Sequence, residues 1–270
     1  MQKELKMLSI VYVFTLFMLF VPNFFSTEIY GMMYFLSLLL PLLLGVFYCI
    51  FEKKKGELFA ALTPNKAIFK TLPCVAPTLF VVTGVSYLTT LLLTALTGRT
   101  NALELGESLP LALLVYALLP SVMEELLFRF LPLALIGKRS PRLCILFSAT
   151  AFALVHHSFF SIPHAFVAGV VFMAIDLFAG SVYPSLIAHF LNNVLSVIWI
   201  MYSGEVLFSF FYFGTLLLFA LLSFFIVFIK RREYLPALRT LLSGRERYET
   251  VPEAALLLFA TLLMAIFEFF

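Results

Sequence analysis

The chain has 270 residues, of which 63% are hydrophobic and 12% are charged, and its formal net charge is +3. A soluble domain is typically about half apolar and about a quarter charged, so this composition excludes a soluble protein. The small net charge gives no electrostatic footprint for nucleic acid. We therefore expect a polytopic protein embedded in the lipid bilayer.

Apolar segments long enough to cross a membrane follow one another along most of the chain, since a spanning helix needs about 20 apolar residues. The expected core spans are 7–25, 29–51, 71–97, 109–136, 142–160, 163–180, 181–202 and 205–229. The first of these lacks a small-x-small cleavage site and is expected to be retained. A ninth segment, 253–270, either crosses the membrane or lies in its interface. The sequence therefore predicts an all-α transmembrane bundle with eight core spans, forming a single integral membrane domain over residues 1–270.

Basic residues gather in alternate loops of this arrangement. They are Lys3 and Lys6, Lys53, Lys54, Lys55, Lys66 and Lys70, Lys138, Arg139 and Arg142, and Lys230, Arg231, Arg232, Arg239, Arg245 and Arg247. The intervening loops contain a single Lys or Arg residue, Arg99. Because cytoplasmic loops carry an excess of Lys and Arg, the N-terminus is predicted to be cytoplasmic.

Three charged residues, Glu124, Glu125 and Arg129, stand inside the fourth span. A charge at membrane depth is costly, at roughly 3 kcal/mol on insertion scales. Residues four apart share a helix face, so Glu125 and Arg129 are expected to pair. Glu124 is turned about 100° away and is expected to be a free carboxylate. A role for all three in holding helices together is the alternative.

The fourth span also contains Pro120 and would be about 42 Å long if straight, which exceeds the bilayer core. Proline lacks the N–H that would bond the carbonyl of Tyr116. We therefore expect a kink or break near Pro120.

Two further pairs of residues share a helix face in later spans, Phe152 with His156 and His189 with Asn193. At 1.5 Å per residue, Glu124, His156 and Asn193 lie about 20 Å from the cytoplasmic ends of their spans, and His189 about 12 Å. These side chains are therefore expected to converge in one layer of the membrane.

Other polar residues are expected to be peripheral. We interpret His157 as a neighbour at the cavity mouth and His164 as interfacial. Asn192 is expected to face away from Asn193 and to bond a neighbouring helix. Asp176 lies near the cytoplasmic end of its span, where snorkelling or a structural hydrogen bond is the expected role.

In chain order, EExxxR at Glu124 to Arg129, FxxxH at Phe152 to His156 and HxxxN at His189 to Asn193 resemble the motifs of the CPBP family. This family comprises intramembrane proteases of the CAAX-prenyl-endopeptidase and bacteriocin-processing types, also called Abi proteins. The resemblance covers residues 109–202, whereas the helices outside this core carry no motif. It implies endopeptidase activity on a CAAX-like or other membrane-associated peptide substrate.

By position in the motifs, the resemblance implies that Glu124 is the general base that activates water, with His156 beside it. It implies that His189 and Asn193 bind the oxyanion. Peptide hydrolysis needs such a base and such donors for the tetrahedral intermediate. An asparagine donates only through its side-chain amide, which suits an oxyanion site.

The same resemblance makes Glu125, Arg129 and Phe152 supporting residues of the site. The first two agree with the pairing expected from their spacing of four residues.

A metal site is an alternative, because Glu124, His156 and His189 offer one carboxylate and two imidazoles to a zinc ion. The sequence contains no HExxH motif, and the spacing does not separate a metalloprotease from a metal-free glutamate protease. We expect either no cofactor or a single zinc ion, and we favour metal-free chemistry.

Two other classes of function fit an intramembrane polar cluster. One is a non-catalytic immunity or scaffold protein that keeps the cavity. The other is a proton-coupled carrier that uses the glutamates and histidines as a relay, although the chain shows no internal repeat. The substrate, a short peptide, a membrane protein or a prenylated tail, is not specified by these residues.

Overall fold

The computed structural model describes residues 1–24, 27–98, 108–156, 158, 160–202, 204, 206–232, 235, 236 and 239. The described chain is all-α, as predicted. Its α-helices are α1 Gln2–Phe20, α2 Thr27–Phe51, α3 Lys55–Leu62, α4 Ala67–Thr71, α5 Val75–Thr97, α6 Leu109–Ala112, α7 Leu119–Glu125, α8 Pro141–Leu154, α9 Ile162–Ala179, α10 Tyr183–Tyr202 and α11 Val206–Ile229. Tighter 3-10 turns occur at Val21–Phe24 (η1) and Leu72–Cys74 (η2), and wider π-helical turns at Leu113–Leu118 (η3), Leu126–Phe130 (η4) and Leu133–Gly137 (η5).

Six helical segments of the described residues are long and apolar enough to cross a membrane. They are Met32–Phe51, Ala67–Thr97, Leu109–Gly137, Ile162–Ala179, Tyr183–Tyr202 and Val206–Ile229. The chain is therefore a multi-pass integral membrane protein. Each of these segments overlaps one of the eight predicted spans.

The other two predicted spans, 7–25 and 142–160, are not shown to cross. Helix α1 has three charged residues in its first turns, Lys3, Glu4 and Lys6. Helix α8 has 14 residues and extends only about 21 Å, which is shorter than a bilayer core. The predicted ninth segment, 253–270, lies outside the described residues.

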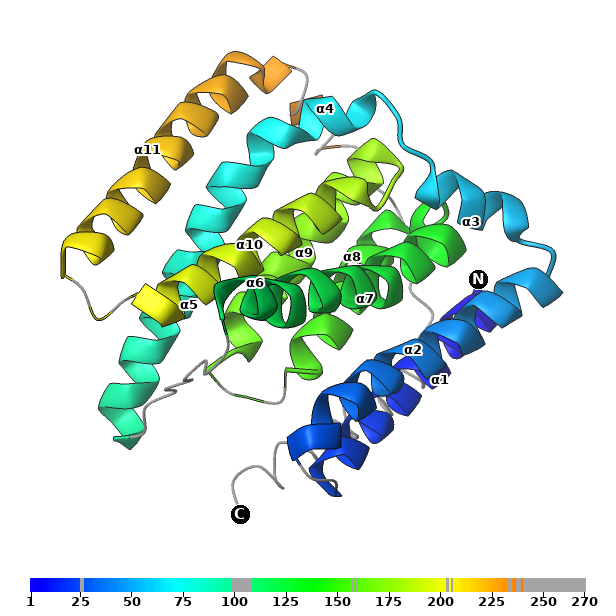
Figure 1. The fold of residues 1–270 in the computed structure, drawn as a ribbon. Helices are drawn as coiled ribbons and strands as arrows, with labels where there is room; N and C mark the ends of the chain where they lie inside the picture. The colour runs from blue at the N-terminus through cyan, green and yellow to red at the C-terminus, as the bar shows by residue number, and fades with distance from the viewer. Residues whose placement is uncertain are drawn as a thin grey trace.

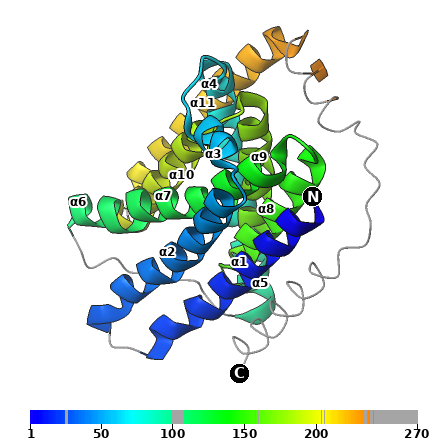
Figure 2. The same ribbon diagram turned by 90° about the vertical axis from the view of Figure 1, so that its right-hand side faces the viewer.

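The fourth predicted span stays helical through Pro120, so the break that was one of the two expectations, a kink or a break, is absent. The irregularity takes the form of π-helical turns before and after α7, at η3 and η4. Figure 2 shows α6 and α7 following one another along a single rod. A π turn hydrogen-bonds five residues back, so it widens the helix locally without ending it. Such turns often occur at functional sites.

The helices that carry the motifs pack against one another. Helix α10 contacts α9 and α7, and α9 contacts α8. Gly169 permits the close approach of α9 to α8, because a Cβ there would lie 2.7 Å from the Cα of Ala149. Figure 1 shows α1 and α2 as an adjacent pair on one side of this group, and α5 with α11 on the other.

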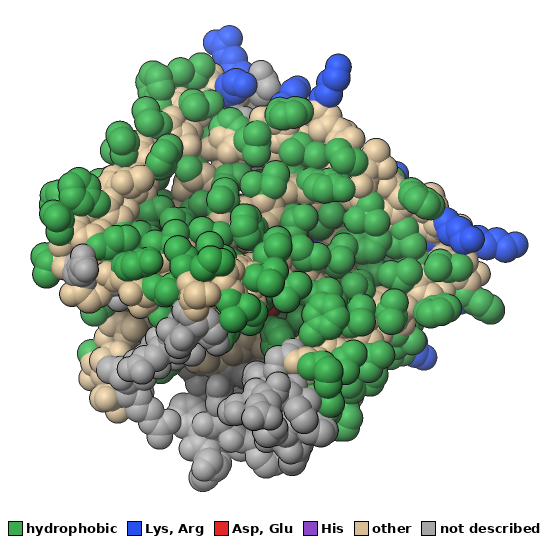
Figure 3. Space-filling model, in the orientation of Figure 1, with side chains coloured by type: hydrophobic (Ala, Val, Ile, Leu, Met, Phe, Trp, Pro, Cys, Tyr) green, Lys and Arg blue, Asp and Glu red, His purple; other side chains and the backbone are tan. Residues whose placement is uncertain are grey.

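The outer surface is apolar over a broad area. Figure 3 shows hydrophobic side chains across most of one face, with Lys and Arg at its edges. Large apolar residues such as Phe210 and Phe211 on α11 are more than half exposed. A soluble monomer rarely exposes apolar patches of this extent, whereas lipid covers them in a bilayer.

Three segments with predicted cytoplasmic basic residues meet at one carboxylate. Glu4 lies 2.7 Å from the N-terminal amine and 2.9 Å from Arg139, and it also accepts from Lys54. The N-terminus, the turn after α2 and the turn before α8 therefore lie on the same side of the bundle. This agrees with their predicted common side, while the assignment of that side to the cytoplasm stays a prediction.

Candidate active site

The polar residues of the three motifs lie on neighbouring helices. Helix α7 carries Glu124 and Glu125 at its end, and α10 carries His189 and Asn193. His156 follows the last residue of α8 by two positions. Because α10 packs against α7, the adjacent glutamates and the histidine of α10 come within direct contact.

Glu125 is fully buried, and one of its carboxylate oxygens contacts both Arg129 and His189. Its Oε1 lies 3.2 Å from an Arg129 guanidinium nitrogen, which is the i, i+4 pair that the spacing predicts. The same oxygen lies 2.7 Å from Nδ1 of His189. Since a carboxylate only accepts, Nδ1 of His189 carries the hydrogen and donates it. Glu125 therefore joins the first and third motifs across the α7–α10 interface.

Arg129 is also fully buried, and aromatic rings surround it. Its guanidinium carbon lies 3.8 Å from the ring centre of Phe152 and 5.4 Å from that of Phe172. None of its nitrogens makes a well-aligned hydrogen bond within the described part of the chain. A cation over an aromatic face is stabilised by about 2 kcal/mol or more when it is desolvated. The aromatic residue of FxxxH thus contacts the cation of EExxxR.

Glu124 differs from its neighbour in both of its contacts. Its Oε1 accepts a hydrogen bond from the hydroxyl of Tyr34 on α2, at 3.1 Å. Its Oε2 lies 3.8 Å from Nε2 of His189. That distance is too long for a direct hydrogen bond. Glu124 is 6% exposed, so its carboxylate is buried but not completely enclosed.

His156 and His189 share an aromatic neighbour, Phe152. Its Nδ1 lies 2.8 Å from the carbonyl oxygen of Phe152 and donates to it, which leaves Nε2 without the hydrogen in the neutral ring. The Phe152 ring centre is 4.8 Å from the His156 ring and 5.4 Å from the His189 ring. Phe152 therefore contacts the two imidazoles as well as Arg129.

Asn193 is held from two directions. Its Nδ2 donates to the hydroxyl of Ser121 at 3.2 Å, and Ser121 donates onward to the carbonyl of Ala117. Its Oδ1 accepts from Nδ2 of Asn192 at 3.3 Å. The expectation that Asn192 faces away from Asn193 is wrong, because an amide side chain is long enough to reach back to the next residue. One of the two N–H groups of Asn193 remains for a ligand.

Asp176 on α9 is completely buried, so its side chain does not snorkel. Its carboxylate accepts from the backbone N–H of Ser185 at 3.0 Å and from the Ser185 hydroxyl at 2.6 Å. Ser185 lies in the first turn of α10, one turn before His189. The structural hydrogen bond expected for Asp176 is therefore present, and it fixes the start of α10.

The remaining histidines are placed differently. His164, near the start of α9, has its Nδ1 3.2 Å from the carbonyl oxygen of Phe160 and takes no part in the contacts above. His157 lies outside the described residues.

The zinc alternative is not supported by the arrangement of the side chains. Among the described residues, no three His, Cys, Asp or Glu side chains converge as metal ligands would. We therefore derive no step through a metal ion.

Tyr34 was missed by the sequence reasoning. A single tyrosine in an apolar helix far from the motifs gives no local signal, and only the packing of α2 against α7 brings it to Glu124.

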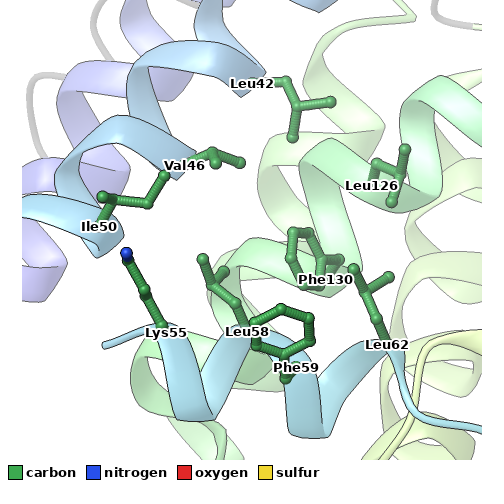
Figure 4. A pocket seen from close by; sticks show the side chains of 9 residues that line it. All are labelled: Leu42, Val46, Ile50, Lys55, Leu58, Phe59, Leu62, Leu126 and Phe130. Atoms are coloured by element: carbon green, nitrogen blue, oxygen red, sulfur yellow. The ribbon is translucent and has the colours of Figure 1, made fainter. Parts of the chain in front are cut away.

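A cavity of about 490 Å³ lies beside the site but is separate from it. Its lining residues are Leu42, Val46 and Ile50 from α2, Lys55, Leu58, Phe59 and Leu62 from α3, and Leu126 and Phe130. Figure 4 shows these side chains around the space between α2, α3 and the segment that follows Glu125. The lining is apolar except for Lys55 and includes none of the motif residues.

Residues 106–195 match a family model described as Rce1-like: Type II CAAX prenyl endopeptidase Rce1-like. The matched segment contains all three motifs, so the resemblance inferred from them is confirmed over these residues. Comparisons with curated proteins and with solved structures gave no match. Helices α1 and α2, including Tyr34, precede the matched segment.

Proposed function

We propose that this protein, whose residues 106–195 match the type II CAAX prenyl endopeptidase family, is an intramembrane endopeptidase. Its substrate would be a peptide or a protein segment at the membrane. The observation that carries the proposal is the relation of one imidazole to two glutamates. His189 is 2.7 Å from Glu125 through Nδ1 and 3.8 Å from Glu124 through Nε2. The two adjacent acids are thereby given different tasks.

Glu124 is the general base. Its Oε1 is held by Tyr34, so its Oε2 is the oxygen that takes a proton from water. This oxygen lies 3.8 Å from Nε2 of His189. A water and the reacting carbonyl group placed beside the two atoms would therefore be close to the base and to the imidazole. A base must lie within hydrogen-bond reach of the proton that it removes, and a carboxylate beside this space meets that requirement.

His189 supplies a donor for the oxyanion. Its Nδ1–H is fixed on the Glu125 carboxylate, which holds the ring and stabilises its positive charge, as the aspartate does in a Ser-His-Asp triad. In the ring that carries a hydrogen on both nitrogens, Nε2–H then donates to the carbonyl oxygen as negative charge develops there. Arg129 balances the charge of Glu125 and lies too deeply buried to contact substrate.

Asn193 supplies a second donor to the same oxygen. Its amide is oriented by Ser121 and Asn192, and one N–H is still available. Donors that are already oriented before reaction stabilise an oxyanion strongly in a water-poor site.

The complete reaction balances in two steps. Water attacks the carbonyl carbon while Glu124 takes its proton, and the oxygen becomes an oxyanion bound by His189 and Asn193. The C–N bond then breaks, and Glu124 returns the proton to the leaving amine. We assign to His156 the orientation of the water or the amine through its Nε2.

The test is a cleavage assay on the full-length protein in detergent, with membrane-anchored peptides of varied sequence. Glu124→Gln should abolish cleavage, and Glu57→Gln, an exposed carboxylate on α3, is the matched control that should leave cleavage unchanged. An added chelator should have no effect.

A folded Glu124→Gln protein with full activity would overturn the assignment of the base. No cleavage by the wild type, together with an unchanged phenotype of Glu124→Gln in cells, would favour the non-catalytic scaffold. Uptake driven by a pH gradient in liposomes would favour the carrier.

A further inference from the structure

The strongest unassigned contact of the site comes from outside the family-matched segment. Tyr34 belongs to α2, and its hydroxyl donates to Oε1 of Glu124 at 3.1 Å. Its side chain is partly buried, and α2 packs on α7 where the contact is made. No motif of the sequence includes this residue.

We propose that Tyr34 is the positioning residue of the general base, so that the α1–α2 pair is part of the catalytic apparatus. This inference rests on the proposed function of Glu124. A carboxylate that rotates about its last bond can offer either oxygen to water. A phenol bonded to Oε1 removes that freedom and leaves Oε2 toward His189.

The helices that carry Tyr34 are themselves fixed in register. Ser37, one turn after Tyr34, donates to the carbonyl of Met18 on α1 at 2.7 Å. Tyr12 on α1 is completely buried, and its ring centre lies 5.3 Å from that of Phe128, in the π-helical turn after Glu125. Its hydroxyl also lies 3.5 Å from the carbonyl of Leu127. These contacts tie α1 and α2 to the same segment that presents Glu124.

The buried location makes the contact energetically significant. Hydrogen bonds to charged groups contribute more than neutral ones, and a low local dielectric strengthens them further. Misplacing a reacting group by about 1 Å can cost about 100-fold in rate. The expected cost of losing the Tyr34 hydroxyl is therefore roughly 10- to 100-fold in kcat, with KM little changed because Tyr34 acts on Glu124.

Tyr34→Phe is the decisive variant, because it deletes only the hydroxyl and keeps the ring that packs α2. Tyr48→Phe, on the same helix and away from Glu124, is the matched control. In the cleavage assay, Tyr34→Phe should lower kcat with a nearly unchanged KM, and its thermal midpoint should fall only slightly because the ring that packs α2 is kept. Tyr48→Phe should behave as the wild type.

A second readout does not depend on catalysis. Dicyclohexylcarbodiimide labels carboxyl groups in apolar surroundings, and mass spectrometry gives the labelling rate at Glu124. Freed from the phenol, Glu124 should be labelled several-fold faster in Tyr34→Phe than in wild type, whereas Tyr48→Phe should show no change.

Equal labelling of Glu124 in wild type and Tyr34→Phe would overturn the positioning role, whether or not the protein cleaves peptides. Wild-type kcat in Tyr34→Phe would overturn it as well, because the ring alone would then suffice. Faster labelling in a protein that cleaves no peptide would keep the contact and reject the peptidase proposal, so the two failures are distinguishable.

Discussion

His189 contacts both members of the adjacent glutamate pair, through Nδ1 to Glu125 at 2.7 Å and through Nε2 to Glu124 at 3.8 Å. Consecutive residues on a helix point about 100° apart. One imidazole can therefore contact both carboxylates through different nitrogens, so that Glu125 supports the ring and Glu124 remains available to react. Glu125 also binds Arg129, whereas Glu124 has the phenol of Tyr34 on its other oxygen.

The first prediction concerns Glu125. Glu125→Gln removes the charge opposite Arg129 and leaves that guanidinium buried among Phe152 and Phe172. Breaking a buried ion pair by removing one partner typically costs about 3–5 kcal/mol. We therefore expect a large loss of thermal stability in detergent, together with loss of cleavage.

Glu124→Gln serves as the comparison for that experiment, since Glu124 is not paired with Arg129. It should abolish cleavage while shifting the unfolding midpoint much less. Similar midpoints for the two variants would contradict the division between a supporting and a reactive glutamate.

The second prediction concerns the oxyanion. Asn193→Ala removes one donor and should lower kcat by about 100- to 1,000-fold, the usual cost of deleting one oxyanion-hole donor. Ser121→Ala keeps the amide but frees its orientation, so the loss should be smaller. Steady-state kinetics on one peptide measure both. Equal activity of Asn193→Ala and wild type would remove Asn193 from the mechanism.

The third prediction concerns the first turn of α10. Asp176→Ala leaves the backbone N–H of Ser185 without its buried acceptor, which should destabilise the protein by about 1–3 kcal/mol. The Ser185 hydroxyl keeps the carbonyl of Val182 as an acceptor at 3.0 Å. Asp176→Asn keeps one carbonyl oxygen and should lose less. Hydrogen exchange should rise in the peptide that contains Ser185. Unchanged exchange in Asp176→Ala would show that Asp176 does not fix α10.

The fourth prediction concerns pH. Glu4 precedes the apolar part of α1, outside the candidate spans. Burial raises the pKa of its carboxyl, but hydrogen bonds from Lys54 and the N-terminal amine outweigh that effect and hold the pKa well below its ordinary 4.5. A lowered pKa stabilises the fold above pH 4.5, and this stabilisation is lost progressively as the pH falls below it.

Glu4→Gln should accordingly unfold at a lower temperature than wild type at pH 7, and the difference should shrink at pH 4 and below. Glu57→Gln, which changes an exposed carboxylate, is the control. A difference between Glu4→Gln and wild type that stays constant with pH would reject the ion cluster as its cause.

The sequence predicted the contact within one helix of the site but not the contacts between helices. The pairing of Glu125 with Arg129 follows from a spacing of four residues on one helix, which is a local property. The same reasoning placed Glu124, His156, His189 and Asn193 on three spans but could not give their contacts. Contacts between helices depend on relative depth and rotation, which no periodicity of a single helix contains.

The span count shows a related limit. Apolar length predicted eight core spans, and six are shown among the described residues. Helix α8 is apolar but too short to cross alone, and it packs closely on α9 at Gly169. Pro120 likewise predicted only that the hydrogen-bond ladder of the helix would be interrupted. It did not predict that the interruption would take the form of π-helical turns on both sides of α7.

The sequence by itself determined the membrane class, the order of the three motifs and the identity of the residues that carry charge at depth. These follow from composition and helical spacing, which act within one segment. The tertiary structure alone decided that His189 lies between Glu125 and Glu124, that Tyr34 reaches the same carboxylate, and that Asp176 fixes the start of α10. Each of these contacts joins separate helices, and their packing sets which side chains meet.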